Sequence, residues 1–237
     1  MNMSPEERLI VALDVPTRAE ADALADALDE DVRWFKIGLE LYSSEGPELV
    51  RDYTAAGRRV FVDLKLHDIP ATVGRATKRL AGLGAGLLTI HSAGGKAMME
   101  AAVTAAAEGA GDSGRLRILA VTVLTSLEQS DLAAVGIDAS ISDLVVQRAR
   151  LAAEAGCDGV VASPHEAAVL RAALPEEFLI VTPGVRPAGA ALGDQKRVMT
   201  PSKARLAGAD MIVVGRPIRD AESPSASAQS IIKELAS

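Results

Sequence analysis

Short apolar runs recur along the chain at a fairly even pitch, and most of them are continuous rather than alternating. Continuous runs that are rich in Val and Ile are typical of strands buried on both faces, as in a parallel sheet. We therefore expect eight strands, over Leu9–Leu13, Trp34–Leu39, Val60–Leu64, Leu87–Ile90, Ile118–Leu124, Gly159–Ala162, Phe178–Val181 and Met211–Val214.

Amphipathic stretches with helix start and stop signals lie between these runs. Thr17 and Glu20 have the spacing of a capping box before a helix rich in Ala and Leu. Proline in a first turn and glycine after a last turn mark other helices. We expect these helices from Pro47 to Gly57, over 141–155, over 165–173 and from Thr200 to Gly208.

The expected elements alternate regularly between strand and helix, which implies right-handed βαβ units. Eight units in 237 residues predict a TIM (β/α)8 barrel, with residues 1–237 as a single domain. A doubly wound open sheet is the alternative, but no Gly-x-Gly-x-x-Gly follows the first run. Residues 187–199 are expected to form a long mobile loop, and the serine-rich stretch 223–230 a surface connection to the last helix.

Composition and charge narrow the class of protein. The net charge is −7, both signs are mixed along the chain, and only six residues are aromatic, so we expect no nucleic-acid polymer as a partner. The single cysteine, Cys157, cannot form an intramolecular disulfide, and His67, His91 and His165 lack the spacing of a zinc site. No apolar run approaches the ~18 residues that span a bilayer, and residues 1–8 do not resemble a signal peptide. We expect a cytoplasmic enzyme or binding protein without membrane contact.

Candidate chemistry lies at the predicted strand ends, because the carboxyl ends of barrel strands and the loops after them build the active site. In strand order, these ends hold Asp14, then Lys36, then Asp63 with Lys65 and Asp68, then His91, then Thr125 with Ser126, then Arg186, and finally Gly215 with Arg216.

The third strand end is the most informative. Side chains alternate along a strand, so Asp63 and Lys65 face the same way. Charges inside a barrel are costly unless they are paired, so a structural ion pair that plugs the barrel is one interpretation. Lys36 and Asp14 at neighbouring strand ends favour a functional site, because four ionisable groups exceed what plugging requires. Asp68 lies past the strand, where it could cap a helix, point into the site or reach another chain.

A lysine between carboxylates keeps its charge and is a positioned proton donor. The sequence shows no metal, flavin or pyridoxal motif to accompany Lys65. This combination suits a reaction that makes a carbanion and quenches it with a proton, without a cofactor or a metal ion.

The eighth strand end has the features of an anion site. Barrel phosphates often bind after strands seven and eight, where Gly215 would let backbone amides approach an anion and Arg216 would offer a fork of donors. Arg186 and Gln195 could close over the anion from the preceding loop. The alternative for Arg216 is a solvated surface arginine.

The fourth and fifth strand ends are open to two interpretations each. The hydroxyl groups of Thr125 and Ser126 could bind the edge of a heterocycle, or they could serve a turn or helix start. His91 could act in the site, or it could be a hydrogen-bonded interior histidine.

These residues lie in segments that resemble the orotidine 5′-phosphate decarboxylase family. The segment Asp63-Leu-Lys-Leu-His-Asp-Ile-Pro70 is similar to the family signature, although its Asp-x-Lys-x-x-Asp core alone is shared with related barrels. The resemblance runs from about residue 9 to 235 and includes, in the same order as in the family, Leu13-Asp14, Lys36-Ile-Gly38, Thr89-Ile-His-Ser92, Leu124-Thr-Ser126, Thr182-Pro-Gly-Val-Arg-Pro187, Asp194-Gln-Lys-Arg-Val198 and Val214-Gly-Arg-Pro217.

The resemblance implies a homodimeric TIM barrel that converts orotidine 5′-phosphate to UMP and carbon dioxide without a cofactor, the last step of de novo pyrimidine synthesis. Lys65 would protonate carbon 6 of the ring, and Asp63 would lie beside the substrate carboxylate. The other implied roles are ribose contact by Asp14 and Lys36, contact with the partner subunit's site by Asp68 and Thr72, recognition of the pyrimidine edge by Ser126 with Thr125 nearby, and phosphate binding by Arg186, Gln195, Gly215 and Arg216.

Two rival functions remain open. A related barrel with the same core motif could use a metal ion to decarboxylate a sugar-acid phosphate or to condense formaldehyde with a pentose phosphate. Ser126 and the phosphate set from Gln195 to Arg216 argue against it. A non-catalytic barrel could bind a phosphorylated ligand, and such a protein needs no proton donor.

Overall fold

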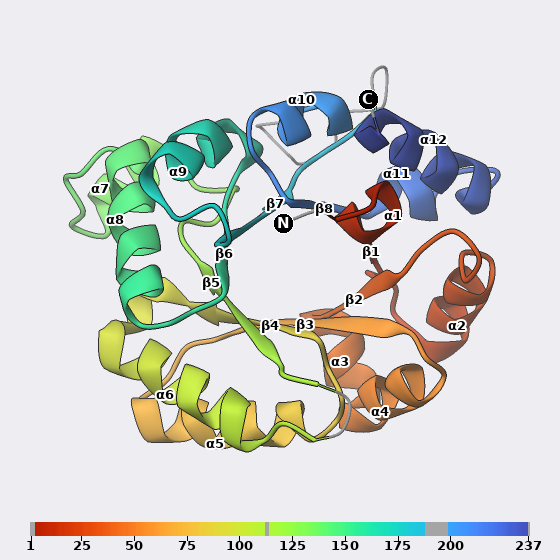
Figure 1. Cartoon of the computed structure of the whole chain (residues 1–237), viewed down its shortest axis with the longest axis horizontal. Helices are drawn as coiled ribbons and strands as arrows, with labels where there is room; N and C mark the ends of the chain where they lie inside the picture. Colours follow the sequence, from red (N-terminus) through yellow and green to blue (C-terminus); the bar gives the residue numbers. More distant parts are fainter. Residues whose placement is uncertain (1–2, 112–113, 188–198, 237) are drawn as a thin grey trace.

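The computed structural model describes residues 3–111, 114–187 and 199–236. Eight parallel strands close into a barrel in sequence order, and helices surround it (Figure 1). The TIM-barrel prediction is confirmed, and an open sheet is excluded because the last strand pairs with the first. The strands are β1 (Leu9–Ala12), β2 (Trp34–Gly38), β3 (Arg59–Leu66), β4 (Leu87–His91), β5 (Arg117–Val121), β6 (Gly159–Val161), β7 (Leu179–Pro183) and β8 (Met211–Val214).

The helices begin and end at signals that the sequence carries. Thr17 accepts a hydrogen bond from the amide of Glu20 at the start of α2, and Pro47 opens α4. The α-helices are α1 (Pro5–Arg8), α2 (Arg18–Asp26), α3 (Leu39–Glu45), α4 (Pro47–Ala55), α5 (Pro70–Ala81), α6 (Lys96–Glu108), α7 (Gln129–Ala134), α8 (Ile141–Glu154), α9 (Ala167–Ala173), α10 (Pro201–Leu206), α11 (Arg216–Arg219) and α12 (Pro224–Ala236), with short 3-10 turns η1 (Ser92–Gly94) and η2 (Pro164–Glu166). No described helix is long and apolar enough to cross a membrane.

Two apolar clusters follow from the alternation of side chains along the strands. On β1, Leu9 and Val11 pack in the cluster between strands and helices, while Ile10 and Ala12 belong to the cluster inside the barrel. The interior cluster is completed by Trp34, Phe61, Leu87, Leu119, Leu179, Val181, Met211 and Val213. Because this cluster fills the barrel, the polar groups at the strand ends lie above an apolar floor.

Most predicted bounds agree with the structure to within two residues, but two predictions are wrong. β5 ends at Val121 and not at residue 124. The amide of Thr122 still donates to the carbonyl of Val161, and the chain leaves the sheet after this bond. The stretch 223–230 is not a surface connection, because α12 begins at Pro224. The hydroxyl of Ser223 accepts a hydrogen bond from the amide of Ala226, and serine in a first turn favours a helix start. Of the predicted loop 187–199, residues 188–198 lie outside the described residues.

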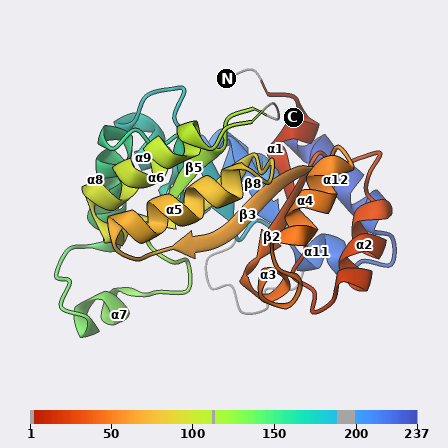
Figure 2. The same ribbon diagram turned by 90° about the horizontal axis from the view of Figure 1, so that it is seen from below.

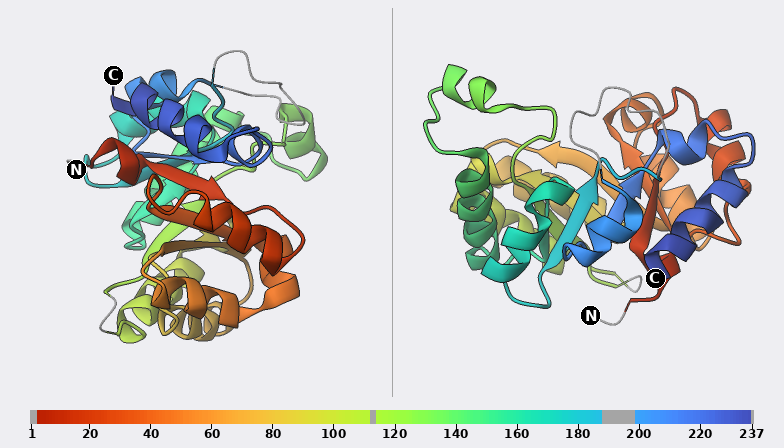
Figure 3. Two further views of the ribbon diagram at one scale, coloured as in Figure 1. Left: turned by 90° about the vertical axis from the view of Figure 1, so that its right-hand side faces the viewer. Right: turned by 90° about the horizontal axis from the view of Figure 1, so that it is seen from above.

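The segment between β5 and α8 extends away from the barrel on the side of the strand carboxyl ends. It carries α7, which stands clear of the ring of helices in Figure 2. The two chain ends lie at the opposite end of the barrel (Figure 3). The barrel therefore separates the end that holds the termini from the end that holds the loops expected to carry function.

We expect the interior cluster to be important for stability. Leu119 is fully buried, whereas Leu206 on α10 is 77% exposed. Leu119→Ala should lower the free energy of unfolding by about 2–5 kcal/mol, because it removes packing and leaves a cavity. Leu206→Ala, the matched control, should change that free energy by less than about 0.5 kcal/mol. Urea unfolding measures both values, and equal losses would contradict a filled barrel.

Candidate active site

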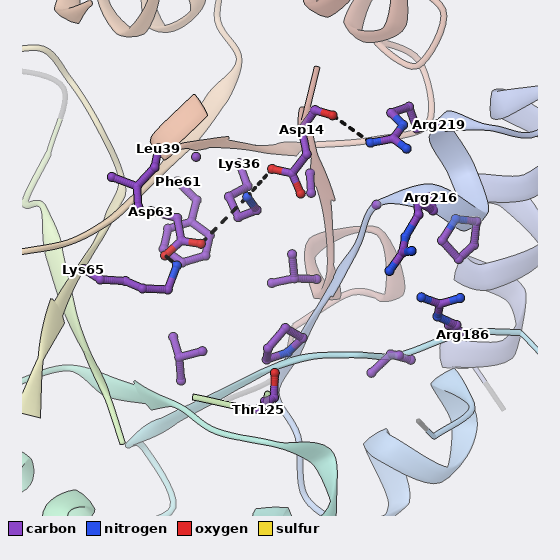
Figure 4. A pocket seen from close by; sticks show the side chains of 18 residues that line it. Asp14, Lys36, Leu39, Phe61, Asp63, Lys65, Thr125, Arg186, Arg216 and Arg219 are labelled. Carbon is purple, nitrogen blue, oxygen red and sulfur yellow. Dashed lines mark hydrogen bonds and ion pairs between the residues drawn. The ribbon is translucent and has the colours of Figure 1, made fainter. Parts of the chain in front are cut away.

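A cavity of about 510 Å³ opens at the carboxyl ends of the strands. Ala12, Phe61 and Val213 of the interior cluster form part of its wall, so its lower end is apolar. Its polar lining comes from Asp14, Lys36, Asp63, Lys65, Thr125, Arg186, Arg216 and Arg219 (Figure 4). The volume is in the range of small-molecule sites.

Four charged side chains form one connected network along the ends of β1, β2 and β3. Nζ of Lys36 lies 2.7 Å from Oδ1 of Asp14 and 3.8 Å from Oδ2 of Asp63. Nζ of Lys65 donates to Oδ1 of Asp63 at 2.9 Å. The side chains of Lys36 and Asp63 are only 9% and 15% exposed. The carboxylate of Asp63 is thus held between two ammonium groups with little water around it (Figure 4).

The environment of Asp63 keeps its carboxylate ionised. Burial alone would raise its pKa, but the charges of Lys36 and Lys65 and the hydrogen bonds from Lys65 and Thr89 outweigh burial and hold the pKa below its ordinary value. Oγ1 of Thr89 donates to Oδ1 of Asp63 at 2.8 Å. The ionised carboxylate therefore stabilises the fold above the ordinary pKa of aspartate, and this contribution is lost as the pH falls through the lowered pKa.

The backbone at Lys65 departs from a regular strand. Lys65 has φ 51°, the one positive φ at a described residue other than glycine, and the pairing of β3 with β4 shifts register between Val62 and Leu66. The amide of Lys65 donates to the hydroxyl of Thr89 at 2.9 Å. The side chains of Asp63 and Lys65 are in contact, as predicted. The regular alternation of side chains along a strand does not by itself explain this contact. The contacts of Lys65 with Thr89 and Asp63 hold a conformation that costs an isolated residue about 1–2 kcal/mol.

Gly38 packs directly against this network. A Cβ atom at this position would lie 2.9 Å from Nζ of Lys36 and 3.2 Å from Oδ1 of Asp14. A larger residue would therefore push the Lys36–Asp14 pair apart.

The other end of the cavity is cationic. Arg186, after β7, is only 6% exposed, and Arg216 begins α11 after Gly215. Burial and the nearby guanidinium of Arg216 lower the pKa of Arg186. Two guanidinium groups near each other at the mouth of a cavity favour an anion between them. Gln195, predicted to join them, lies outside the described residues.

Three predicted site residues do not line the cavity of their own chain, namely Asp68, Thr72 and Ser126. His91, whose role the sequence left open, does not line it either. Asp68 is exposed and accepts a hydrogen bond from the amide of Ile69 at 2.6 Å. It is not a helix N-cap, because Ile69 has that place before Pro70. Ser126 is exposed as well, whereas its neighbour Thr125 lines the cavity.

His91 is half-buried and hydrogen-bonded. Its ring stacks on His67 at 5.3 Å between centroids, and its Nδ1 accepts from the amide of Ala93 at 3.2 Å. Burial, followed by the charges of His67, Arg148 and Lys65, lowers its pKa to about 4. The ring is therefore neutral at pH 7. Within the described part of the chain, no group of three or more His, Cys, Asp and Glu side chains is arranged to hold a metal ion.

Residue types alone did not point to three residues of this site: Gly38, Thr89 and Arg219. For Thr89 the available signal was a polar residue in an apolar strand. Arg219 follows Arg216 by one helical turn, and its Nη1 donates to the carbonyl of Asp14 at 2.7 Å.

The chain matches known proteins along almost its whole length. A family model described as orotidine 5′-phosphate decarboxylase / HUMPS family matches residues 7–231. The chain belongs to this family. Among relatives, the orotidine 5′-phosphate decarboxylase of Anaeromyxobacter sp. strain K is 54% identical over 233 residues, which are 98% of this chain and 100% of that protein. The one of Afipia carboxidovorans is 51% identical over 233 residues, 98% of this chain and 96% of that protein.

Two solved structures also match this chain along almost its whole length. The orotidine 5′-phosphate decarboxylase of Lactobacillus acidophilus is 35% identical, with a TM-score of 0.88 over 97% of this chain and 99% of that one. An uncharacterized conserved protein of Geobacillus kaustophilus is 38% identical, with a TM-score of 0.85 over 96% and 99%.

The ionisation of Asp63 can be tested directly. In the wild type, its pKa should lie below the ordinary value for aspartate. Lys36→Met combined with Lys65→Met leaves burial without the ammonium charges, so the pKa should rise above that value. Lys78→Met, the control, removes an exposed lysine paired with Glu108 and should change nothing at Asp63. Carboxyl carbon-13 NMR titration gives each pKa, and a pKa that stays low in the double variant contradicts the assignment.

Proposed function

We propose that the protein decarboxylates orotidine 5′-phosphate to UMP and carbon dioxide, the last step of de novo pyrimidine synthesis, without a cofactor. The observation that carries the proposal is the Asp63 carboxylate held between Lys36 and Lys65 in a cavity whose other end holds Arg186 and Arg216. One end suits a reacting carboxylate and a proton transfer, and the other suits a phosphate. Relatives named orotidine 5′-phosphate decarboxylase match 98% of this chain.

The substrate would lie along the cavity with its phosphate at the cationic end. Arg186, Arg216 and the backbone at Gly215 would bind the phosphate, and Gln195 is proposed to join them. Asp14 and Lys36 would contact the ribose. Contacts to the remote phosphate supply binding energy that places the ring against Lys65 and excludes water.

The pyrimidine edge would face the loop after β5. Ser126 is the proposed contact, with Thr125 beside it. Of these two residues, Thr125 lines the cavity and Ser126 does not. A contact from Ser126 therefore requires this loop to move inward when the ligand binds.

The chemical step needs only one bond broken and one proton moved. The bond between carbon 6 and the carboxylate breaks, carbon dioxide leaves, and the electron pair stays on carbon 6. The ammonium of Lys65 stabilises this carbanion and then gives it a proton, and solvent restores the proton on Lys65. Asp63 holds the ammonium of Lys65 in place through their 2.9 Å ion pair. Because Asp63 is itself an anion, it would also repel the substrate carboxylate before the bond breaks.

The functional unit is proposed to be a homodimer of single barrel domains, each formed by residues 1–237. Asp68 and Thr72 would reach the partner subunit's site. Support comes from their place after β3, outside the cavity of their own chain, and from the exposed apolar Ile69 between them. The cytoplasm is the proposed location, because a multiply charged nucleotide does not cross a membrane unaided.

Removal of the proposed proton donor tests the mechanism. Lys65→Ala should abolish measurable decarboxylation of orotidine 5′-phosphate and still bind UMP. Lys65→Arg should also be inactive, since a guanidinium retains the charge but releases its proton poorly. Lys78→Ala is the matched control on an exposed lysine and should behave as wild type. An ultraviolet assay and UMP titration measure both properties. Near-normal turnover by Lys65→Ala would refute the mechanism. Wild-type protein that binds UMP but never turns over substrate would be a non-catalytic barrel that only binds a phosphorylated ligand.

Subunit mixing tests the shared site. Lys65→Ala and Asp68→Ala homodimers should each be inactive. After subunit exchange, each mixed dimer holds one intact site, so random pairing restores about a quarter of the wild-type activity. Exchange is verified with differently tagged subunits. Verified exchange with no recovery would show that Asp68 serves its own chain.

A further inference from the structure

Arg219 connects the cationic end of the cavity to the charge network. It lies on α11, one turn after Arg216, and it lines the cavity. Its Nη1 donates to the main-chain carbonyl of Asp14 at 2.7 Å (Figure 4). Its Nε and Nη2 donate to the two carboxylate oxygens of Asp220 at 2.6 and 3.1 Å. The guanidinium is therefore held by the neighbouring carboxylate while it reaches across to the end of β1.

Asp14 extends this connection into the network. Its carbonyl accepts from Arg219, and its Oδ1 accepts from Nζ of Lys36 at 2.7 Å. Lys36 in turn faces Asp63, which binds Lys65. A continuous path of hydrogen bonds and ion pairs thus runs from α11 to the proposed proton donor.

This path connects α11 to the chain after β1 at a level where sheet hydrogen bonds no longer join β1 and β8. The ladder between β1 and β8 ends at the pair Val11–Val214, and α11 begins at Arg216. Beyond that pair, the bond from Arg219 to Asp14 ties α11 to the chain that follows β1. Because it ends on a main-chain carbonyl, this bond positions the backbone of Asp14 rather than neutralising a charge.

We propose that Arg219 is a positioning residue, which sets the distance between the phosphate end of the cavity and the Asp14–Lys36–Asp63–Lys65 network; this inference rests on the proposed function. A substrate held at its phosphate meets Lys65 correctly only if these two parts keep a fixed separation. Small errors in such positioning cost large factors in rate. Arg219 therefore acts on turnover more than on nucleotide binding.

The test compares turnover with binding in the full-length protein. Arg219→Ala should lower kcat for orotidine 5′-phosphate by about 10- to 100-fold, while the Kd for UMP stays within about threefold of wild type. Arg219→Lys can still donate one hydrogen bond to Asp14 but lacks the guanidinium fork, so it should recover part of kcat. Asp220→Asn loosens the guanidinium and should give a smaller loss in the same direction. Arg51→Ala, which removes an exposed arginine paired with Glu48 on α4, is the control and should match wild type in both measurements.

Each outcome separates the inference from the proposed function. Wild-type protein without turnover would refute the function itself. Active wild type with an unchanged kcat in Arg219→Ala would refute the inference alone. Weaker UMP binding with an unchanged kcat would mean that Arg219 binds phosphate by its charge, which also overturns the positioning role. If the alanine variant does not fold, Arg219→Gln keeps most of the packing without the fork, and the same separation of kcat from Kd is expected.

Discussion

The buried carboxylate of Asp63 stays ionised because two ammonium groups face it, and much of the local structure serves that contact. Lys65 takes a positive φ, and Thr89 bonds both to its amide and to the carboxylate. Gly38 leaves room for the ammonium of Lys36. An anion in this place would be costly without its partners. The strain at Lys65, the hydroxyl of Thr89 and the missing side chain of Gly38 are therefore parts of one arrangement.

The barrel gives this arrangement its setting. The interior cluster fills the space beneath the strand ends, so the charges lie over apolar side chains such as Phe61. Charges held in fixed positions near an apolar wall act strongly on charge that develops in a reaction, because little solvent must reorganise. The cationic pair, Arg186 and Arg216, lies at the other end of the same cavity. The proposed phosphate site and the proposed site of proton transfer thus lie at different ends of the cavity. They are connected through α11 and the end of β1.

The sequence was sufficient for the features that depend on local pattern. Continuous apolar runs indicated all eight strands, and the strand-end rule brought Asp14, Lys36, Asp63 and Lys65 to one place. Sequence patterns were not sufficient where tertiary contacts determine the local conformation. The register shift at Lys65 depends on Thr89 from another strand, and the tie from Arg219 to Asp14 joins residues 205 positions apart. The proposed roles of Asp68 and Thr72 involve a second chain, which no pattern in one sequence displays.

In the proposed mechanism, positioned charges of the protein alone decarboxylate a pyrimidine nucleotide. The most direct measurement is an ultraviolet assay of orotidine 5′-phosphate with wild-type protein that has been treated with EDTA. This mechanism predicts loss of substrate absorbance with formation of one UMP for each substrate consumed, at the same rate with and without EDTA. Absence of turnover would contradict it. So would turnover that disappears with EDTA and returns when a divalent metal ion is added, because that behaviour belongs to a metal-dependent barrel.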